Sequence, residues 1–290
     1  MLNGLGNLTQ ATSAKGYRLR PLLNYYGGKW NAAPWILSHF PAHEIYVEPF
    51  GGGASVLLRK PRSKREIYND LDKEIVNLFT VARDAGETLR AQLCLTPHSR
   101  VEYHNAFEPS NNAIEQARRT IVKSYFGIGD SMFKKSNGMR TSKKSNTCVA
   151  TSWRNYWFGF NQIVERLQGV TIECLDYREL IEKYDGPETL FYLDPPYVRA
   201  TRSVRHAYRH AYRHAYRHDF NDEDHKEFIK TLSKIKGMAI VSGYYHKFYE
   251  TLDWKKVSAQ FKTQKKTFAT ETLWLSPATV KAASQLELCL

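Results

Sequence analysis

The sequence predicts an open α/β sheet that is interrupted by a mostly helical, basic insertion. Strand-type apolar runs alternate with helical patterns in two segments, residues 23–84 and the stretch from 169 onward. Between them, residues 86–168 show helical spacing around a polar loop that is rich in lysine. Because alternating strands and helices form parallel sheets covered by helices, we expect the two outer segments to build one sheet.

Each predicted element depends on local periodicity. Apolar residues at helical spacing predict helices, and short apolar runs bounded by turn residues predict buried strands. Asn221, which is followed by three acidic residues, predicts the start of a helix. The other predicted helices are Lys29–Phe40, one through residues 75–79, Asn111–Tyr125 and Tyr156–Leu167. The predicted strands are Glu44–Glu48, Glu66–Tyr68, Val170–Cys174, Thr189–Leu193, Met238–Ser242 and Thr272–Leu275.

These elements predict three parts of the chain. Residues 1–16 are rich in Gly, Asn, Ser and Thr, and we expect a flexible tail there. The sheet domain is expected at 17–85 and 169–290, and the inserted domain at 86–168.

Composition favours a polyanionic partner. The chain has 290 residues and a formal net charge of +13, although such a charge by itself can equally serve solubility. No apolar run is long enough to span a bilayer, and the first residues lack the pattern of a secretory signal. None of the four cysteines lies in a C-x-x-C pair. We therefore expect a cytoplasmic protein without a metal site, a disulfide framework or membrane contact.

The most specific pattern is Asp194-Pro195-Pro196-Tyr197, which directly follows the apolar run Leu190–Leu193. Two prolines end the strand and stiffen the turn. A carboxylate and an aromatic ring are thereby expected at the C-terminal edge of the sheet, where open α/β sheets bind ligands. An isolated tetrapeptide of this kind could also be a plain strand-ending turn.

These residue types suit chemistry on the exocyclic amine of a heteroaromatic base. The lone pair of such an amine is delocalised into the ring, so acceptors placed against its N–H bonds make the nitrogen a better nucleophile. The Asp194 carboxylate and the Pro195 carbonyl can supply two acceptors, and Tyr197 can stack on the base. A carboxylate is too weak a base to deprotonate the neutral amine first, so methyl transfer would precede proton loss. The base would have to leave the duplex to reach this turn.

A glycine-rich turn follows the first predicted strand, with the sequence Glu48-Pro49-Phe50-Gly51-Gly52-Gly53. Glycines let a ligand approach the backbone closely and open the start of a helix. The turn lacks both the G-x-G-x-x-G order and a Lys-Ser/Thr ending, which disfavours nucleotide binding. Asp70, at the end of the next strand, is placed to accept hydrogen bonds from a ribose or to cap the following helix.

Together these motifs resemble the D12 class of DNA adenine N6-methyltransferases, the Dam-like group, from about residue 22 to 276. The resemblance depends on the order of Tyr25-Tyr26-Gly27-Gly28-Lys29, the glycine-rich turn, Asn69-Asp70 and Asp194-Pro195-Pro196-Tyr197. It implies a Rossmann-like sheet that binds S-adenosyl-L-methionine, with residues 86–168 as the inserted target recognition domain.

The resemblance also implies roles for single residues. Many relatives carry Trp at the position of Tyr25, and Lys29 considered alone would more often be a solvated surface lysine. The implied cofactor-binding residues are Tyr25, Lys29, Glu48, Phe50, Gly51, Gly52, Gly53, Asp70, Asp176 and Asp194. The implied catalytic residues are Asp194, Pro195, Pro196 and Tyr197, and this chemistry needs no metal.

Two basic stretches are candidates for contact with double-stranded DNA. One is the polar loop 127–152, and the other contains the unit Arg-His-Ala-Tyr three times between residues 205 and 216. Arginines spaced by aromatic residues suit phosphate contact and base stacking, although the repeat could equally be a neutral insertion. The DNA-contacting candidates are Lys134, Lys135, Arg140, Lys143, Lys144, Arg202, Arg205 and Arg209.

Other interpretations stay open from the sequence. Turns of the D-P-P-Y type also serve N4-cytosine methylation and protein glutamine methylation. The basic insertion favours nucleic acid over protein, and only the resemblance favours adenine over cytosine. A DNA-binding protein with a decayed active site is a further alternative, which the intact motifs disfavour. A cognate restriction endonuclease is a candidate partner in a bacterium or phage, and the oligomeric state is not indicated.

Overall fold

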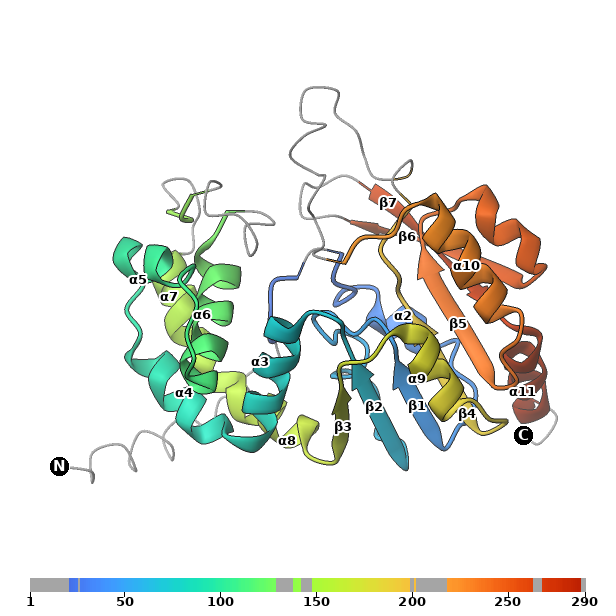
Figure 1. Cartoon of the computed structure of the whole chain (residues 1–290), viewed down its shortest axis with the longest axis horizontal. Helices are drawn as coiled ribbons and strands as arrows, with labels where there is room; N and C mark the ends of the chain where they lie inside the picture. Colours follow the sequence, from blue (N-terminus) through green and yellow to red (C-terminus); the bar gives the residue numbers. More distant parts are fainter. Residues whose placement is uncertain are drawn as a thin grey trace. The chain divides into compact units, whose positions relative to one another are not determined.

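The computed structural model describes residues 21–25, 27–128, 138–141, 148–198, 201, 218–262 and 268–287. The chain divides into two compact units (Figure 1). A helical unit comprises Met1–Tyr25 and Asn77–Gln168, and a sheet unit comprises Tyr26–Val76 and Gly169–Leu290. The second of the three divisions along the chain falls inside helix α3 (Lys73–Asp84), so no loop or change of composition marks it in the sequence.

Among the described residues, seven strands of the sheet unit form one sheet in the order β3-β2-β1-β4-β5-β7-β6. Strands β1 to β5 run parallel, and β7 is antiparallel to both β5 and β6. The order reverses between β1 and β4, which is the kind of switch point where open α/β sheets bind ligands. The sheet is the Rossmann-like one that the sequence predicts. The strands are β1 Ile45–Glu48, β2 Arg65–Asn69, β3 Val170–Glu173, β4 Thr189–Leu193, β5 Met238–Gly243, β6 Lys255–Lys262 and β7 Phe268–Leu275.

Helices cover the central strands, which are buried along their whole length. On one face, α9 (Tyr177–Tyr184) and α10 (Asp222–Leu232) lie in front of the sheet in Figure 1 and share a hydrophobic cluster with its strands. Asp176 caps α9, and Asn221 caps α10 in a capping box, which confirms the helix start predicted there. The same face also carries η6 (Lys247–Leu252), whose Tyr249 belongs to the cluster.

Two more helices belong to the sheet unit. Helix α2 spans only Ala33–Leu37, and the aromatic ring of Phe40 beyond it packs on Tyr46 and Tyr192. Helix α11 (Pro277–Glu287) is tied to β5 by hydrogen bonds between Thr279 and Ala239.

The helical unit has its own core. Large aromatic side chains dominate it: Phe126 and Trp153 meet edge to face at 4.9 Å between ring centroids, and Trp153 stacks on Tyr156 at 5.5 Å. Gly86 lets α4 approach Val164 of α8, because a Cβ there would lie 2.5 Å from that side chain. The described elements are α4 Gly86–Leu95, α5 Arg100–Asn105, α6 Ala113–Phe126, α7 Val149–Tyr156, η3 Trp157–Gly159 and α8 Phe160–Leu167.

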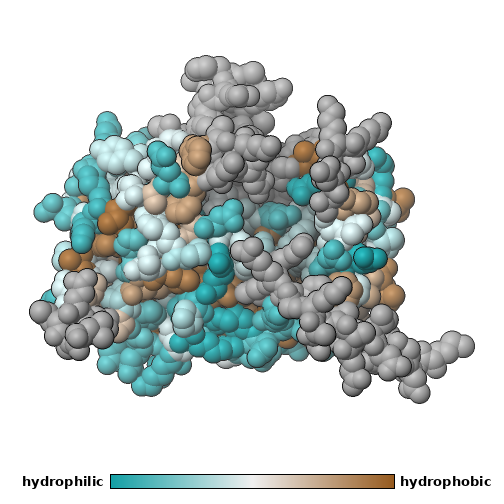
Figure 2. Space-filling model, turned by 180° about the vertical axis from the view of Figure 1, so that it is seen from behind, coloured by the Kyte–Doolittle hydropathy of each residue, from teal (hydrophilic) through white to brown (hydrophobic). Residues whose placement is uncertain are grey.

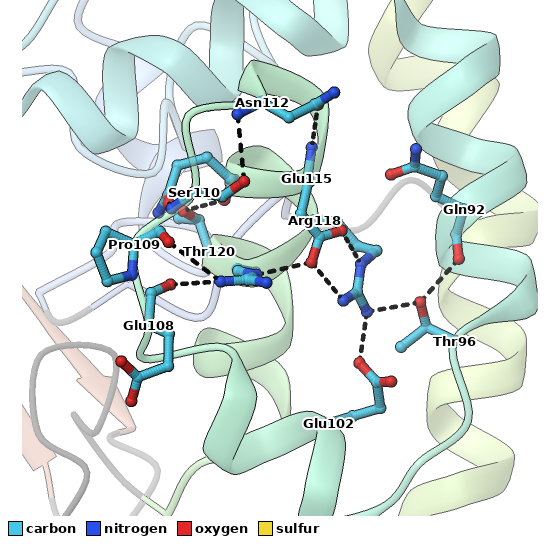
Figure 3. A network of polar contacts seen from close by, with 12 residues as sticks. Gln92, Thr96, Glu102, Glu108, Pro109, Ser110, Asn112, Glu115, Arg118 and Thr120 are labelled. Atoms are coloured by element: carbon cyan, nitrogen blue, oxygen red, sulfur yellow. Dashed lines mark hydrogen bonds and ion pairs between the residues drawn. The ribbon is translucent and has the colours of Figure 1, made fainter.

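A polar network ties α5 and α6 to the end of α4 (Figure 3). The guanidinium of Arg118 donates to both carboxylate oxygens of Glu115, at 2.7 and 2.8 Å. It also donates to Glu102 at 2.7 Å and to Thr96 at 3.0 Å. Every arm of the guanidinium is engaged within the unit, so the network acts as a structural clamp.

The structure departs from the sequence analysis in three places. Strand β6 was not predicted, because Lys255–Lys262 is an edge strand with exposed and half-buried positions and no apolar run. The predicted helix Lys29–Phe40 is shorter, since Pro34 restricts its first turn. The glycine-rich turn leads into hydrogen-bonded turns at 55–59 and not into a helix.

On the face drawn in Figure 2, hydrophobic residues lie in scattered patches among hydrophilic ones. Each helix in the described part of the chain is too short or too polar to cross a lipid bilayer.

Candidate active site

The candidate site lies in the sheet unit, at the C-terminal ends of the parallel strands. Glu48 ends β1, Asp70 follows β2, Asp176 follows β3 and Asp194 follows β4. Because these strands are neighbours in the sheet, the four predicted carboxylates come from one edge of it. Asp194 stands on the β4 side of the switch point, and the glycine-rich turn stands on the β1 side.

Lys29 and Asp194 form a buried ion pair. Lys29 Nζ lies 2.8 Å from each carboxylate oxygen of Asp194 and 3.2 Å from the carbonyl oxygen of Gly27. Only 6% of the Lys29 side chain is exposed, against 20% for Asp194. The ordinary expectation of a solvated surface lysine is therefore wrong here. Lys29 contacts the carboxylate of the D-P-P-Y turn directly.

Two further groups surround the Lys29 ammonium. It donates a hydrogen bond to the Tyr197 hydroxyl and lies 3.6 Å from Glu271 Oε1, on the antiparallel strand β7. Tyr197 in turn reaches both oxygens of Glu271 at 3.4 Å. Burial alone would lower the pKa of Lys29, but the carboxylates of Asp194 and Glu271 raise it above its ordinary value. Lys29 is thus a permanent cation between two carboxylates.

The two oxygens of Asp194 differ in their hydrogen bonds. Oδ1 accepts from Lys29 and, at 3.1 Å, from Ser242 Oγ, whose hydroxyl is 2.8 Å from that of Tyr192. Within the described ranges, Oδ2 accepts only from Lys29. A carboxylate oxygen can accept two hydrogen bonds, so Oδ2 keeps one acceptor position.

Aromatic rings stand beside this carboxylate. The ring of Tyr197 packs against that of Tyr244 with centroids 4.6 Å apart. Tyr197 is buried and its hydroxyl is held by Lys29, whereas Tyr244 is half-buried. Burial raises the pKa of Tyr244, and the nearby carboxylates of Glu271 and Asp194 raise it further, so Tyr244 is within electrostatic reach of both. The ring that the sequence singled out is fixed in place, and Tyr244 next to it is the more accessible one.

The glycine-rich turn is packed tightly against β2. The amide of Gly51 donates to the carbonyl of Asn69 at 2.8 Å, and a Cβ on Gly51 would lie 2.1 Å from the Tyr68 ring. Gly52 has φ 47°, a left-handed conformation that glycine adopts readily. Its amide donates to Asp70 Oδ2 at 2.8 Å. These contacts explain why side chains are missing at this point of the chain.

Asp70 is a loop residue and not the cap of α3. Its other oxygen accepts from the amide of Asp72 at 2.8 Å, while Asp72 itself accepts from Glu74 in the first turn of α3. Burial raises the pKa of Asp70 to about 6, against the effect of its two backbone donors. The carboxylate is thereby fixed at the end of β2 with acceptor positions left over.

Glu48 and Asp176 have structural partners of their own. Glu48 is 2% exposed, and its Oε1 accepts from Tyr46 at 2.6 Å and from the amide of Leu57 at 2.8 Å. Burial raises its pKa to about 7. Asp176 pairs with Arg178 at 2.8 Å while it caps α9. Phe50 is half-buried and packs on Tyr177.

Other predicted residues lie elsewhere. Tyr25 belongs to the helical unit. Arg140 also belongs to the helical unit, where it is half-buried next to the β-bridge between Gly127 and Met139. Within the described ranges, no three His, Cys, Asp or Glu side chains gather closely enough to hold a metal ion. The predicted DNA contacts that fall outside the described residues are Lys134, Lys135, Lys143, Lys144, Arg202, Arg205 and Arg209.

Sequence reasoning missed three residues of the site. Ser242 and Tyr244 lie at the end of β5, next to β4 in the sheet, and the strand-end rule that selected Asp194 could have selected them too. Glu271 lies on an antiparallel strand, just ahead of the apolar run by which that strand was recognised. Only tertiary folding brings it to Lys29, so no local pattern pointed to it.

Comparison with known proteins agrees with this geometry. The profile of the family described as D12 class N6 adenine-specific DNA methyltransferase matches residues 25–269. The chain is 24% identical over 277 residues to the type II methyltransferase M.MjaIII of Methanocaldococcus jannaschii, covering 83% of this chain and 92% of that protein. Over 190 residues it is 24% identical to the DNA adenine methylase of Vibrio cholerae and 25% identical to that of Escherichia coli. Each of these matches covers 61% of this chain and 65% of the bacterial protein.

The family match includes every motif of the site, from Lys29 and the glycine-rich turn to Asp70 and the Asp194 turn. The parallel sheet with its switch point is the fold that these motifs require. The chain therefore belongs to the D12 class of N6 adenine-specific DNA methyltransferases.

Proposed function

We propose that this protein transfers the methyl group of S-adenosyl-L-methionine to the N6 amino nitrogen of an adenine turned out of duplex DNA. The observation that carries the proposal is the fixed Asp194 carboxylate, which Lys29 holds at 2.8 Å through both oxygens while Oδ2 keeps one acceptor position. An exocyclic amine has an N–H to donate to that position. Family membership narrows the amine to N6 of adenine.

Asp194 acts as an acceptor before it acts as a base. Accepting an N–H bond returns electron density to the nitrogen, which a carboxylate could not deprotonate outright. The N6 lone pair then forms the new N–C bond while sulfur keeps the electrons of the broken S–C bond, and a proton of the cationic product passes to Asp194. Lys29 keeps the carboxylate ionised and oriented until that step.

The residues at this edge fit the cofactor. When bound, it supplies a methyl group on a positively charged sulfur. One ammonium and two carboxylates give Lys29, Asp194 and Glu271 a net charge of −1, which complements that cation. Asp70 has acceptor positions left for ribose hydroxyls after its two backbone hydrogen bonds. Phe50 offers a half-buried ring at the same edge.

The ring pair of Tyr197 and Tyr244 suits an extruded base. Stacking on an aromatic side chain repays part of the cost of unstacking the base from the duplex. The Tyr197 hydroxyl is anchored by Lys29, so this ring is already in place before a base arrives. Extrusion is required because the N6 group inside a duplex cannot reach a carboxylate that is only 20% exposed.

We assign DNA recognition to the helical unit and to the basic segments predicted from the sequence. The net charge of +13 supports a phosphate-dominated contact, whose affinity falls steeply with salt because counterions are released. Raising the salt concentration in a DNA-binding titration tests this assignment. A flat response would contradict it.

The proposed reaction is tested by incubating the protein with S-adenosyl-L-methionine labelled in its methyl group and with duplex DNA, then digesting the DNA to nucleosides. We expect the label in N6-methyldeoxyadenosine. Label in N4-methylcytosine or in protein would contradict the proposal. DNA binding without methyl transfer would favour the alternative of a decayed enzyme.

Asp194→Ala is expected to abolish transfer while most affinity for cofactor and DNA remains. Asp185→Ala is the matched control, because Asp185 also accepts hydrogen bonds, in its case from the backbone amides of Lys236 and Gly237, but it precedes β4 and so lies at the opposite end of that strand. Full activity of Asp194→Ala would rule out the role given to this carboxylate.

A further inference from the structure

We propose that Glu271 is a positioning residue for methyl transfer, which gives the buried Lys29 ammonium a second anion so that Asp194 can take up a proton without leaving that cation unpaired. This inference rests on the proposed function. It adds a residue from β7 that belongs to none of the motifs of the site.

The geometry places Glu271 next to both Lys29 and Tyr197. Its Oε1 lies 3.6 Å from Lys29 Nζ, and both of its oxygens lie 3.4 Å from the Tyr197 hydroxyl. Only 9% of its side chain is exposed. A carboxylate taken this far out of water is costly unless it is paired, and Lys29 is the cation beside it.

The reaction changes the charge next to Lys29. When a proton leaves the methylated nitrogen, that nitrogen keeps the electron pair of the N–H bond and the proton joins Asp194. Asp194 then becomes neutral, and its ion pair with Lys29 is lost. An ammonium that is 6% exposed would be left without an anion, were Glu271 not beside it. Glu271 therefore makes it easier for Asp194 to accept the proton.

Asp194 and Glu271 share the Lys29 ammonium, and this sharing decides in which direction each carboxylate shifts the pKa of the other. Two carboxylates compete for one ammonium, so each raises the proton affinity of the other. Removing the charge of Glu271 leaves Lys29 entirely to Asp194 and makes Asp194 a weaker base. The other titratable groups that surround the pair are Glu48 on β1, Tyr192 on β4, Tyr197 after β4, Tyr244 after β5 and Tyr249 in η6.

The test is a titration of the cofactor-free protein. The 13Cγ resonance of Asp194, assigned by its loss in Asp194→Asn, is followed between about pH 3 and 9, a range that begins below the ordinary aspartate pKa of about 3.9. We expect Glu271→Gln to lower the titration midpoint of Asp194 by about one pH unit or more. Because the pKa of Glu48 is raised to about 7, the comparison is repeated in a Glu48→Gln background.

Two further variants complete the comparison. Glu271→Asp keeps the charge on a shorter side chain and should shift the midpoint less, in the same direction. It also serves if Glu271→Gln does not fold. Glu250→Gln, which removes a surface carboxylate paired with Lys256, should leave the Asp194 midpoint unchanged. An unchanged midpoint in a folded Glu271→Gln protein, or in Glu271→Asp if only that variant folds, overturns the inference.

The pH dependence of the methylation rate provides a second test of the role of Glu271. In single-turnover methylation, the acid limb of the rate profile should move to lower pH in Glu271→Gln, together with a lower maximal rate. A lower rate at every pH without movement of the limb would indicate a merely structural role and would also overturn the inference. If the wild-type protein methylates nothing, the proposed function fails, while the titration still tests the coupling of Glu271 to Asp194.

Discussion

Each of the two units contains a cation held between two carboxylates, and we expect the two clusters to have different roles. In the helical unit, Arg118 lies between Glu102 and Glu115 (Figure 3). In the sheet unit, Lys29 lies between Asp194 and Glu271. Arg118 donates from all three of its nitrogens to partners of its own unit, whereas the partners of Lys29 include a carboxylate oxygen that can accept one more hydrogen bond.

The pKa of Glu115 is shifted in the opposite direction from the pKa values of Asp194 and Glu271. The hydrogen bond from Arg118 outweighs burial and lowers the pKa of Glu115 to about 2. In the other cluster burial dominates and raises the pKa of both Asp194 and Glu271. A clamp needs charges that never change, and a site that accepts a proton needs one that can. This difference supports a structural role for the Arg118 cluster and the proposed proton-accepting role for the Asp194 cluster.

Replacing the two cations should separate these roles most strongly. Lys29→Met leaves two buried carboxylates without their cation, and we expect at least about a 100-fold loss in kcat/KM, because Asp194 is no longer oriented. Arg118→Met should cost about 1–3 kcal/mol in the free energy of unfolding and change kcat/KM by less than about threefold in the folded protein. Urea unfolding and single-turnover kinetics on both variants measure this. Equal activity losses in the two would show that the clusters do not differ as argued.

A methyl group on Gly51 should disturb the site through packing alone. Gly51→Ala would place Cβ 2.1 Å from the Tyr68 ring, so the turn or the ring must move, and we expect a loss of about 1–3 kcal/mol in stability. Gly186→Ala is the control in the same unit, since its Cβ would meet nothing closer than 4.0 Å. Thermal unfolding of both variants checks the contrast. An unchanged melting temperature for Gly51→Ala would contradict the tight packing.

The parallel half of this architecture could be predicted from the sequence because its strands are short apolar runs with turn residues at their ends. β4 and the turn after it illustrate this: burial on both faces yields Thr189–Leu193, and Pro195 and Pro196 end it. β6 could not be predicted, because an edge strand carries polar residues that need no burial. Periodicity likewise cannot show a division inside α3, where one helix serves both units.

The same limit applies to the site. Asp194, Asp70 and the glycine-rich turn follow strands directly, so chain order alone brings them to one edge. Lys29 and Glu271 come to that edge from distant parts of the sequence, and their contact depends on tertiary packing. Sequence analysis could name Lys29 only through a family motif, and it could not foresee that this lysine is buried against Asp194.

Acid titration should weaken the helical clamp, whereas the sheet cluster should not add to this loss, because the pKa values of Asp194 and Glu271 are raised in the folded protein. Because the folded-state pKa of Glu115 is lowered from 4.5 to about 2, its contribution is complete above about 4.5 and is lost as the pH falls toward 2. We expect the free energy of unfolding to fall over that window, and Glu115→Gln to flatten the fall. Glu87→Gln, which removes a 75% exposed carboxylate, is the control and should leave the slope unchanged. A slope that Glu115→Gln does not alter would contradict the clamp.

The smallest effect should come from Ser242, which separates orientation by Lys29 from orientation by its helper. Ser242→Ala removes the 3.1 Å hydrogen bond to Asp194 Oδ1 but leaves both bonds from Lys29. A hydrogen bond to a charged group is worth about 1.5–3 kcal/mol at most, and water can replace this one in part, so we expect a fall in kcat/KM of about 5- to 10-fold. Ser258→Ala is the control. It removes a hydroxyl of β6 that is hydrogen-bonded to Thr272 of β7, and it should leave kcat/KM unchanged. Wild-type kinetics in Ser242→Ala would mean that Lys29 alone orients the carboxylate, which would sharpen the contrast with Arg118, whose clamp depends on several partners at once.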